Sequence, residues 1–198
     1  MSPSDPLKVE AGQGDLKEPR LLLLLLESRS DVETGMADWT LSLQLLALLG
    51  VANGTPILAA KLLQDRFGTP LDGGLILPDG EPLFGASKTL RGVILSVVCT
   101  TGAAVLLNLD WGIGTTMAGM SMLGDLFSSF IKRRIHRQLH DQAFGLDQIP
   151  EALLPLLAVK VRFNLTSGDI AALVIAFIVL ELVLSRILFR LKIRDRPY

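Results

Sequence analysis

Long apolar runs, separated by short polar connections, restrict most strongly what this chain of 198 residues can fold into. Four of them have close to the 20 residues that an α-helix needs to cross the hydrocarbon core of a bilayer. They lie at about 39–63, 92–109, 113–131 and 170–189. A segment in lipid must satisfy its own backbone hydrogen bonds, which favours helices. The sequence therefore predicts an all-α, polytopic integral membrane protein.

A fifth apolar run, at about 149–161, is shorter and contains Pro150 and Pro155. Proline lacks a backbone donor and disturbs a helix, so we predict a tilted or broken helix that is lined by neighbouring helices instead of lipid. Counting this segment gives about five transmembrane helices.

Residues 1–38 are predicted to form a flexible, non-catalytic tail, and residues 39–198 the transmembrane domain. The tail places scattered polar residues around six leucines, Leu21–Leu26, which would make only about 9 Å of helix, too short to span a bilayer. The leucines lack the basic start and cleavage site of a signal peptide, and a short interfacial helix is an alternative.

Cations gather in one set of connections. The predicted loops 64–91 and 132–148 and the C-terminal end are rich in Lys and Arg, whereas the connection 108–112 has none. The positive-inside rule places the basic loops in the cytoplasm, with the N-terminus outside and the C-terminus cytoplasmic, which requires an odd number of spans. We expect a multi-pass protein of the cell's inner (cytoplasmic) membrane, with its site facing the cytoplasm.

The stretch GDLFSSFIKRR, at 124–134, sets a carboxylate inside an apolar run and cations at its end. Asp125, Ser129 and Lys132 are spaced i, i+4, i+7 and share one helical face, with Arg133 adjacent. A carboxylate within a membrane is costly unless it is paired or binds a metal, so it indicates function. Spacing alone leaves a second interpretation equally open, in which Asp125 pairs with Lys132 or Arg133 at the interface.

The first basic loop contains PLDGGLILPDGEPLFGASKTLRG, at 70–92. Its glycines allow a close backbone approach, while Lys88, Arg91 and the Thr89 hydroxyl supply the cations and the donor that a phosphate needs. The spacing is not that of a Walker loop. The alternative is a flexible Gly/Pro-rich loop whose charges only follow the positive-inside rule.

A third polar element is FGLDQIPEALL, at 144–154, where Asp147 and Glu151 stand four residues apart at the start of a helix. Two carboxylates there could hold Mg²⁺ through oxygen ligands and water. Plain N-capping by Asp147 is the alternative. The single cysteine, Cys99, excludes an intrachain disulfide and a cysteine metal cluster.

In their order and membrane placement, these motifs resemble the CDP-archaeol synthase family, membrane cytidylyltransferases related to CDP-diacylglycerol synthases. The resemblance covers roughly residues 52–157. Its motifs are ANGTP (52–56), PLDGG (70–74), GASKTLRG (85–92), GDLFSSFIKRR (124–134) and LDQ (146–148). Archaeal members typically read GDGKTWRG where this chain has GASKTLRG, so the family's Asp is replaced by Ala86 and its second Gly by Ser87.

The resemblance implies that CMP is transferred from CTP to a lipid phosphate, with release of pyrophosphate. Asp125 and Asp147, with Glu151 as a further candidate, would be the Mg²⁺ ligands. The resemblance assigns catalysis to Asp125, Asp147, Lys132 and Lys88. It assigns the binding of CTP and lipid phosphate to Lys88, Thr89, Arg91, Ser129, Lys132, Arg133 and Asn53.

The expected partners are CTP, a lipid phosphate and the lipid bilayer, with no nucleic acid, and a homo-oligomer is compatible with the sequence.

Two other classes of protein are alternatives to a cytidylyltransferase. A small membrane transporter subunit would use Asp125 and Glu181 along a conduction path, but it would distribute polar groups through the full depth of the bilayer. A non-enzymatic membrane scaffold would tolerate Asp125→Asn and Lys88→Ala.

Overall fold

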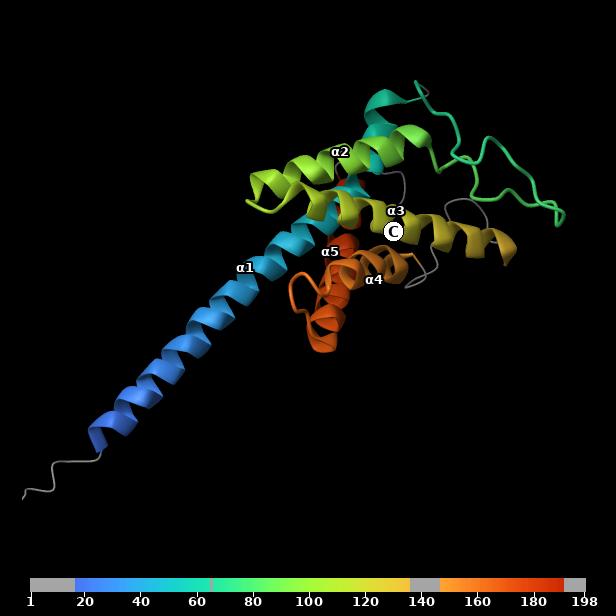
Figure 1. The fold of residues 1–198 in the computed structure, drawn as a ribbon. Helices are drawn as coiled ribbons and strands as arrows, with labels where there is room; N and C mark the ends of the chain where they lie inside the picture. Colours follow the sequence, from blue (N-terminus) through green and yellow to red (C-terminus); the bar gives the residue numbers. More distant parts are fainter. Residues whose placement is uncertain (1–16, 65, 136–146, 191–198) are drawn as a thin grey trace, which may run out of the picture. The chain divides into compact units, whose positions relative to one another are not determined.

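The computed structural model describes residues 17–64, 66–135 and 147–190, with side chains from residue 39 onward except at 188 and 189. Regular secondary structure in these residues is helical, which confirms the all-α prediction (Figure 1). The helices are α1 (Lys17–Leu63), α2 (Leu90–Leu106), α3 (Trp111–Arg134), α4 (Gln148–Val159) and α5 (Ser167–Arg190). The chain divides into two compact units, Met1–Leu41 and Ser42–Tyr198.

Helix α1 begins at Lys17 and not near Trp39, so the predicted tail is helical from residue 17 onward. Leucine is a strong helix former, and Leu21–Leu26 lie in a stretch that no proline interrupts before Pro56. The sequence prediction treated the leucine run as a separate segment because it is too short to span. Residues 1–16 of the predicted tail lie outside the described residues.

Among the described residues, two helices are long and apolar enough to cross a membrane, Trp39–Leu63 and Ser167–Ile187. Helices α2 and α4 are apolar but shorter, at 17 and 12 residues. Helix α3 has 24 residues, but its glycines, serines and charged side chains lower its hydropathy. The count of five spans stays a prediction.

Helix α4 is continuous over its 12 residues, about 18 Å, so the break that its prolines suggested does not occur within it. Pro150 lies in the first turn, where a backbone donor has no partner to lose, and the helix continues across Pro155. Half of the α4 residues are buried, and the helix packs against α3 and α5. Neighbouring helices thus cover the buried half of this segment, and its shielding from lipid stays a prediction.

Glycines bring helices of the second unit into backbone contact. A Cβ at Gly124 of α3 would overlap the backbone of Pro150 and Glu151 in α4. A Cβ at Gly114 would lie 2.7 Å from the Ala104 Cβ and from the Thr101 Cα in α2. Small residues allow such close approach between membrane helices, and here they determine which side chains of α3 and α4 can meet.

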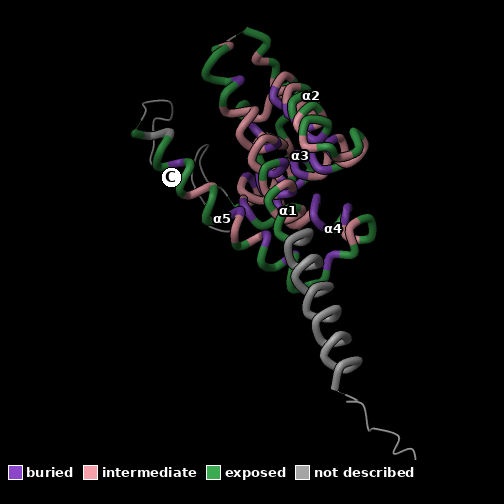
Figure 2. The backbone as a smooth tube through the Cα atoms, turned by 90° about the vertical axis from the view of Figure 1, so that its left-hand side faces the viewer, coloured by how far each residue is buried: buried purple, intermediate pink, exposed green. Residues whose placement is uncertain are grey.

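Helix α1 is joined to α2 and α3 by polar side chains. Pro56 has no backbone N–H, so the Ala52 carbonyl one turn earlier lacks its helical donor. The Ser96 hydroxyl of α2 donates to this carbonyl at 2.7 Å, and the Ser121 hydroxyl of α3 donates to the Asn53 side-chain oxygen at 3.0 Å. The buried positions of the second unit lie where its helices face one another (Figure 2).

Candidate active site

The centre of the candidate site is the Asp125 carboxylate of α3. It forms an ion pair with the Lys88 ammonium, which comes from the loop between α1 and α2. It also interacts with the side chain of Glu151 of α4, which is only 7% exposed. Lys88 acts electrostatically on Glu151 as well. Three segments that are distant in sequence thus converge on one cluster of charges.

A fourth segment reaches the same cluster, because Glu181 of α5 interacts electrostatically with Glu151. Glu181 also lines a mainly apolar pocket between α1 and α5, in which Asn53 is another polar member. The sequence marked Glu181 as a membrane carboxylate, but spacing could not indicate that its charge would act on Glu151. Asn53, a predicted substrate-binding residue, lies in this pocket and accepts the hydrogen bond from Ser121.

A second ion pair connects the same two helices. The Lys132 Nζ of α3 lies 2.5 Å from the Asp147 Oδ2, and both side chains are largely buried. Asp125 and Lys132 therefore both contact α4, and Asp147 and Glu151 both contact α3, as the predicted helical faces require. Asp147 occupies the N-cap position of α4 but makes no capping hydrogen bond, which argues against the plain capping alternative.

The loop that carries Lys88 has defined structure, contrary to the alternative of a flexible loop. We call residues 64–89 the α1–α2 loop. Antiparallel bridges join Pro70 to Thr89 and Ile76 to Pro82. The Leu71 N–H donates to the Lys88 carbonyl at 2.7 Å, so the backbone beside the ammonium is held at the base of the loop.

Asp72 organises the interior of the α1–α2 loop. Its Oδ2 accepts hydrogen bonds from the Phe84 and Gly85 amides at 2.9 and 3.0 Å, and its Oδ1 accepts from the Gly74 amide at 3.0 Å. Burial raises the pKa of Asp72, but these amides outweigh it and hold the pKa below the usual value. Gly85 has a φ of +94°, which favours glycine, and its carbonyl accepts from the Lys88 amide.

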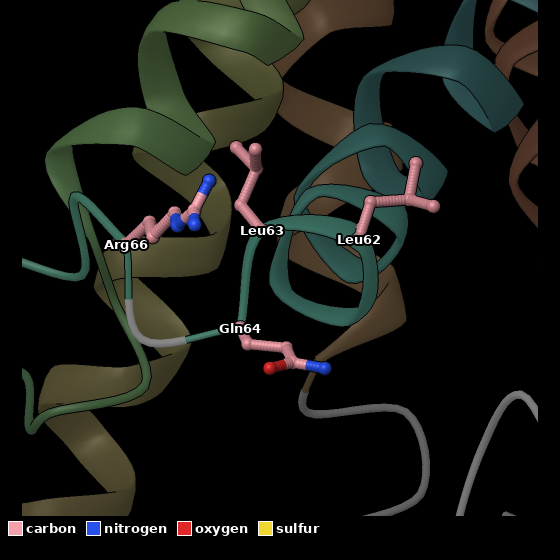
Figure 3. Close-up of a pocket in the computed structure, with 4 residues that line it drawn as sticks. All are labelled: Leu62, Leu63, Gln64 and Arg66. Atoms are coloured by element: carbon pink, nitrogen blue, oxygen red, sulfur yellow. The ribbon is translucent and has the colours of Figure 1, made fainter.

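Two other predicted phosphate-binding residues lie where this loop meets α2. The Thr89 hydroxyl oxygen accepts from the Gly92 amide at 3.3 Å and so caps α2, which leaves its own O–H able to donate. The Arg91 guanidinium donates to the Arg66 carbonyl. A pocket in this area is lined by Leu62, Leu63, Gln64 and Arg66 (Figure 3).

The remaining predicted residues, Ser129 and Arg133, are both buried on α3. Consecutive residues of a helix point about 100° apart, so Lys132, Arg133 and Arg134 face different neighbours. Lys132 meets α4, whereas Arg134 meets the α1–α2 loop. Arg134 and its partner Asp79 were not among the predicted site residues. The sequence KRR at 132–134 does not indicate which neighbour each cation meets.

The predicted Mg²⁺ ligands do not gather as one set of three. Among the described residues, no group of three or more His, Cys, Asp or Glu side chains is arranged to hold a metal ion. Instead Asp125 contacts Glu151, and Asp147 contacts Lys132 through Oδ2 while its buried Oδ1 has no hydrogen-bond partner. Mg²⁺ often uses one or two carboxylates together with substrate phosphates and water, so the Asp125–Glu151 pair fits such an ion.

The fold and these contacts define an all-helical membrane protein with carboxylates and ammonium groups meeting between helices. A family model described as CarS-like, CDP-archaeol synthase, matches residues 51–198. The chain belongs to this family, as its motifs predicted.

Individual proteins agree with the family match. The CDP-archaeol synthase of Pyrobaculum calidifontis is 31% identical over 75% of this chain and 91% of its own length. That of Sulfolobus acidocaldarius is 32% identical over 76% of this chain and 98% of its own length. A solved structure described as an intramembrane enzyme for archaeal membrane lipid biosynthesis has a TM-score of 0.57 and 27% identity. The match covers 69% of this chain and 89% of the chain in the solved structure.

These relatives identify the chain as a membrane-bound enzyme, a nucleotidyltransferase of the cytidylyltransferase type. The alternatives of a transporter subunit and a non-enzymatic scaffold are not favoured. The Lys88–Asp125 pair also differs from the simple interfacial pair that spacing had left open, since Asp125 pairs with a cation from a segment outside α3.

Proposed function

We propose that this chain transfers CMP from CTP to a membrane lipid phosphate and so forms a CDP-activated lipid and pyrophosphate. The family assignment supports the reaction, and one observation supports its location: Lys88, Asp125 and Glu151 meet from three separate segments. The names of the relatives favour an archaeol-type lipid, with isoprenoid ether chains, over fatty acyl esters.

In this reaction an oxygen of the lipid phosphate attacks the α-phosphorus of CTP. A new P–O bond forms, the bond between the α-phosphorus and the bridging oxygen breaks, and that oxygen leaves on pyrophosphate. The nucleophile belongs to the substrate, so no serine or cysteine nucleophile is required. The protein contributes positioning and the neutralisation of negative charge.

Lys88 and Lys132 are the groups we assign to phosphate charge. Lys88 pairs with Asp125, and Lys132 pairs with Asp147. An ammonium has three donors and can keep one contact while offering others to phosphate oxygens. Arg91 and Arg133 would add bidentate contacts, for which guanidinium is suited.

We propose Mg²⁺ as the cofactor, held by Asp125 and Glu151 together with substrate phosphates and water, whereas Asp147 pairs with Lys132. When bound, such an ion neutralises triphosphate charge and acts as a Lewis acid. Glu151 is buried and Asp125 half-buried, and two adjacent carboxylates repel each other, so the Asp125–Glu151 contact itself favours a cation at this position.

We also propose five membrane-crossing segments, with the N-terminus outside and the site at the cytoplasmic edge of the cytoplasmic membrane. The basic α1–α2 loop and the basic end of α3 support this orientation. Because α2 and α4 are short, they would cross with help from neighbouring helices or from a locally thinner bilayer. A homo-oligomer stays a prediction.

The test is an assay of purified protein in detergent with labelled CTP, Mg²⁺ and a lipid phosphate carrying either isoprenoid ether or acyl chains. We expect CDP-lipid and pyrophosphate in equal amounts. Lys88→Ala should lose about 100-fold or more of the activity, as losses of charge-stabilising donors do, whereas Lys61→Ala, at an exposed lysine, should lose little. No CDP-lipid from either substrate, with the protein shown to be folded, would refute the proposal.

A further inference from the structure

Arg134, the last residue of α3, contacts the α1–α2 loop at several points. Its Nη1 forms an ion pair with Asp79. Its Nη2 donates to the carbonyls of Glu81 and Pro82, at 3.3 and 2.8 Å. The guanidinium also lies over the Phe130 ring, 5.3 Å from the ring centre. One side chain thus contacts three loop residues, Asp79, Glu81 and Pro82.

These contacts act on the turn at residues 77–82, which we call the loop tip. The Leu77 amide donates to the Glu81 carbonyl at 2.9 Å, and the Gly80 amide donates to the Leu77 carbonyl at 2.9 Å. Asp79 accepts from the Glu81 amide through Oδ1, so its Oδ2 is directed to Arg134. The loop tip is therefore an ordered turn that offers three acceptors, the Asp79 Oδ2 and two carbonyls, to the two terminal nitrogens of the guanidinium.

The loop tip is connected to Lys88 by a short series of hydrogen bonds. The Leu83 amide, next to the tip, donates to the Leu75 carbonyl, and the following amides of Phe84 and Gly85 donate to Asp72. Gly85 then accepts from the Lys88 amide.

The loop is thus attached to α3 twice, at Asp125 through Lys88 and at Arg134 through the tip. These two α3 residues are nine apart, or about 13 Å along the helix axis. The base of the loop at Lys88 and the loop tip are therefore both held on the same helix. These two attachments fix the position of the loop relative to Asp125.

We propose that Arg134 is a positioning residue: by holding the loop tip against α3, it sets where Lys88 meets Asp125 and the triphosphate. This assignment separates Arg134 from Lys132 and Arg133, which the sequence placed together as phosphate-binding cations. Its kinetic consequence rests on the proposed function, whereas its structural consequence, a loop that opens when the contact is lost, does not.

Asp79→Asn distinguishes this role from direct phosphate binding. If Arg134 positions the loop, Asp79→Asn and Arg134→Ala should each lower kcat/KM for CTP by about tenfold, and the double variant should be no worse than Arg134→Ala. Arg134→Lys should recover part of the loss, since an ammonium can pair with Asp79 but cannot hold both carbonyls in the same fork geometry. Arg162→Ala, at an exposed arginine outside the loop, is the matched control.

A second measurement is independent of catalysis. Trypsin cleavage after Arg66 or Lys88, followed by mass spectrometry in detergent, reports how often the loop opens. We expect cleavage in Asp79→Asn and Arg134→Ala to be about tenfold faster than in the wild type, and cleavage in Arg162→Ala to be unchanged.

Three results would overturn the proposal. The first is a loss of activity in Arg134→Ala with full activity and slow cleavage in Asp79→Asn, which would assign Arg134 to the substrate. The second is an additive loss in the double variant, and the third is wild-type cleavage rates in both single variants. A wild type that makes no CDP-lipid would instead refute the proposed function, and the cleavage rates would still decide the role of Arg134.

Discussion

Two regions supply the charges of the site, and they are held by different physical means. The α3–α4 contact is a close approach of two backbones at Gly124, with buried side chains on both sides. The α1–α2 loop is partly exposed and is held by polar groups, chiefly Asp72 within it and Arg134 outside it. The carboxylates Asp125 and Glu151 thus come from the α3–α4 contact, which close packing makes rigid. Lys88 comes from the α1–α2 loop, which ion pairs and hydrogen bonds hold in place.

The largest effect is expected from adding volume at the helix contact. Gly124→Val should destabilise the protein by about 3 kcal/mol or more and abolish activity, because side-chain atoms would occupy space that the α4 backbone fills. Gly119→Ala, at a glycine of the same helix with open space around it, should keep both stability and activity. Thermal unfolding in detergent and the CDP-lipid assay measure the two effects. A folded, active Gly124→Val would show that the contact is not rigid.

A large loss without unfolding is expected when the carboxylate itself is neutralised. Asp125→Asn keeps the volume of the side chain but removes the charge that Lys88 and a divalent ion would meet, so we expect activity to fall by about 100-fold or more. The unfolding temperature should change little, because a partly exposed ion pair contributes little stability. Activity at wild-type level would remove Asp125 from the mechanism.

A smaller effect is expected from the centre of the loop. Asp72→Asn keeps one acceptor oxygen but loses the charge that orders three amides, and we expect about a tenfold loss of activity with faster cleavage of the loop. Asp110→Asn, at an exposed aspartate that caps α3, is the control. Equal cleavage rates in Asp72→Asn and the control would show that packing, and not this carboxylate, orders the loop.

The same carboxylate predicts a pH dependence for the loop. The pKa of Asp72 is lowered in the folded protein, so its contribution is complete above its usual pKa of 3.8 and is lost as the pH falls through the lower folded value. Hydrogen exchange at the Phe84 and Gly85 amides, corrected for its intrinsic pH dependence, should show protection that is constant near neutral pH and falls only below about pH 4. Protection lost between pH 5 and 7 would assign the effect to another group.

The smallest effect concerns α1. Ser96→Ala should cost about 1 kcal/mol, because the Ala52 carbonyl loses the donor that replaces the missing N–H of Pro56. In a Pro56→Ala background the helix would supply its own donor, so the same change should cost less. Thermal unfolding of the four proteins measures the difference, and an equal cost in both backgrounds would contradict this explanation.

Much of the fold could be predicted from the apolar runs, because helix length and hydropathy are local properties. The start of α1 was missed, since the leucine run was judged by whether it could span a membrane and not by whether it could continue a helix. The prolines left open whether α4 would be broken, and it is continuous because Pro150 falls in the first turn, where it is tolerated. The faces of α3 and α4 were predicted correctly from the i, i+4 and i, i+7 spacing of their charges.

The partners of those charges could not be predicted. Lys88, Lys132 and Arg134 look equivalent in the sequence, yet one meets Asp125, one meets Asp147 and one holds the loop tip. Glu151 was ranked as the weaker metal candidate, but it is the carboxylate that touches Asp125.

The sequence by itself determined the helical membrane class and the family, and it supplied the residues that we propose to bind phosphate and a divalent ion. Those depend on composition, periodicity and motif spacing, all of which can be read along one chain. Only the tertiary structure decided which carboxylate faces which cation. That choice depends on how closely two backbones approach at Gly124 and on the course of the α1–α2 loop. Both arise from contacts between segments far apart in sequence, where no local pattern records the pairing.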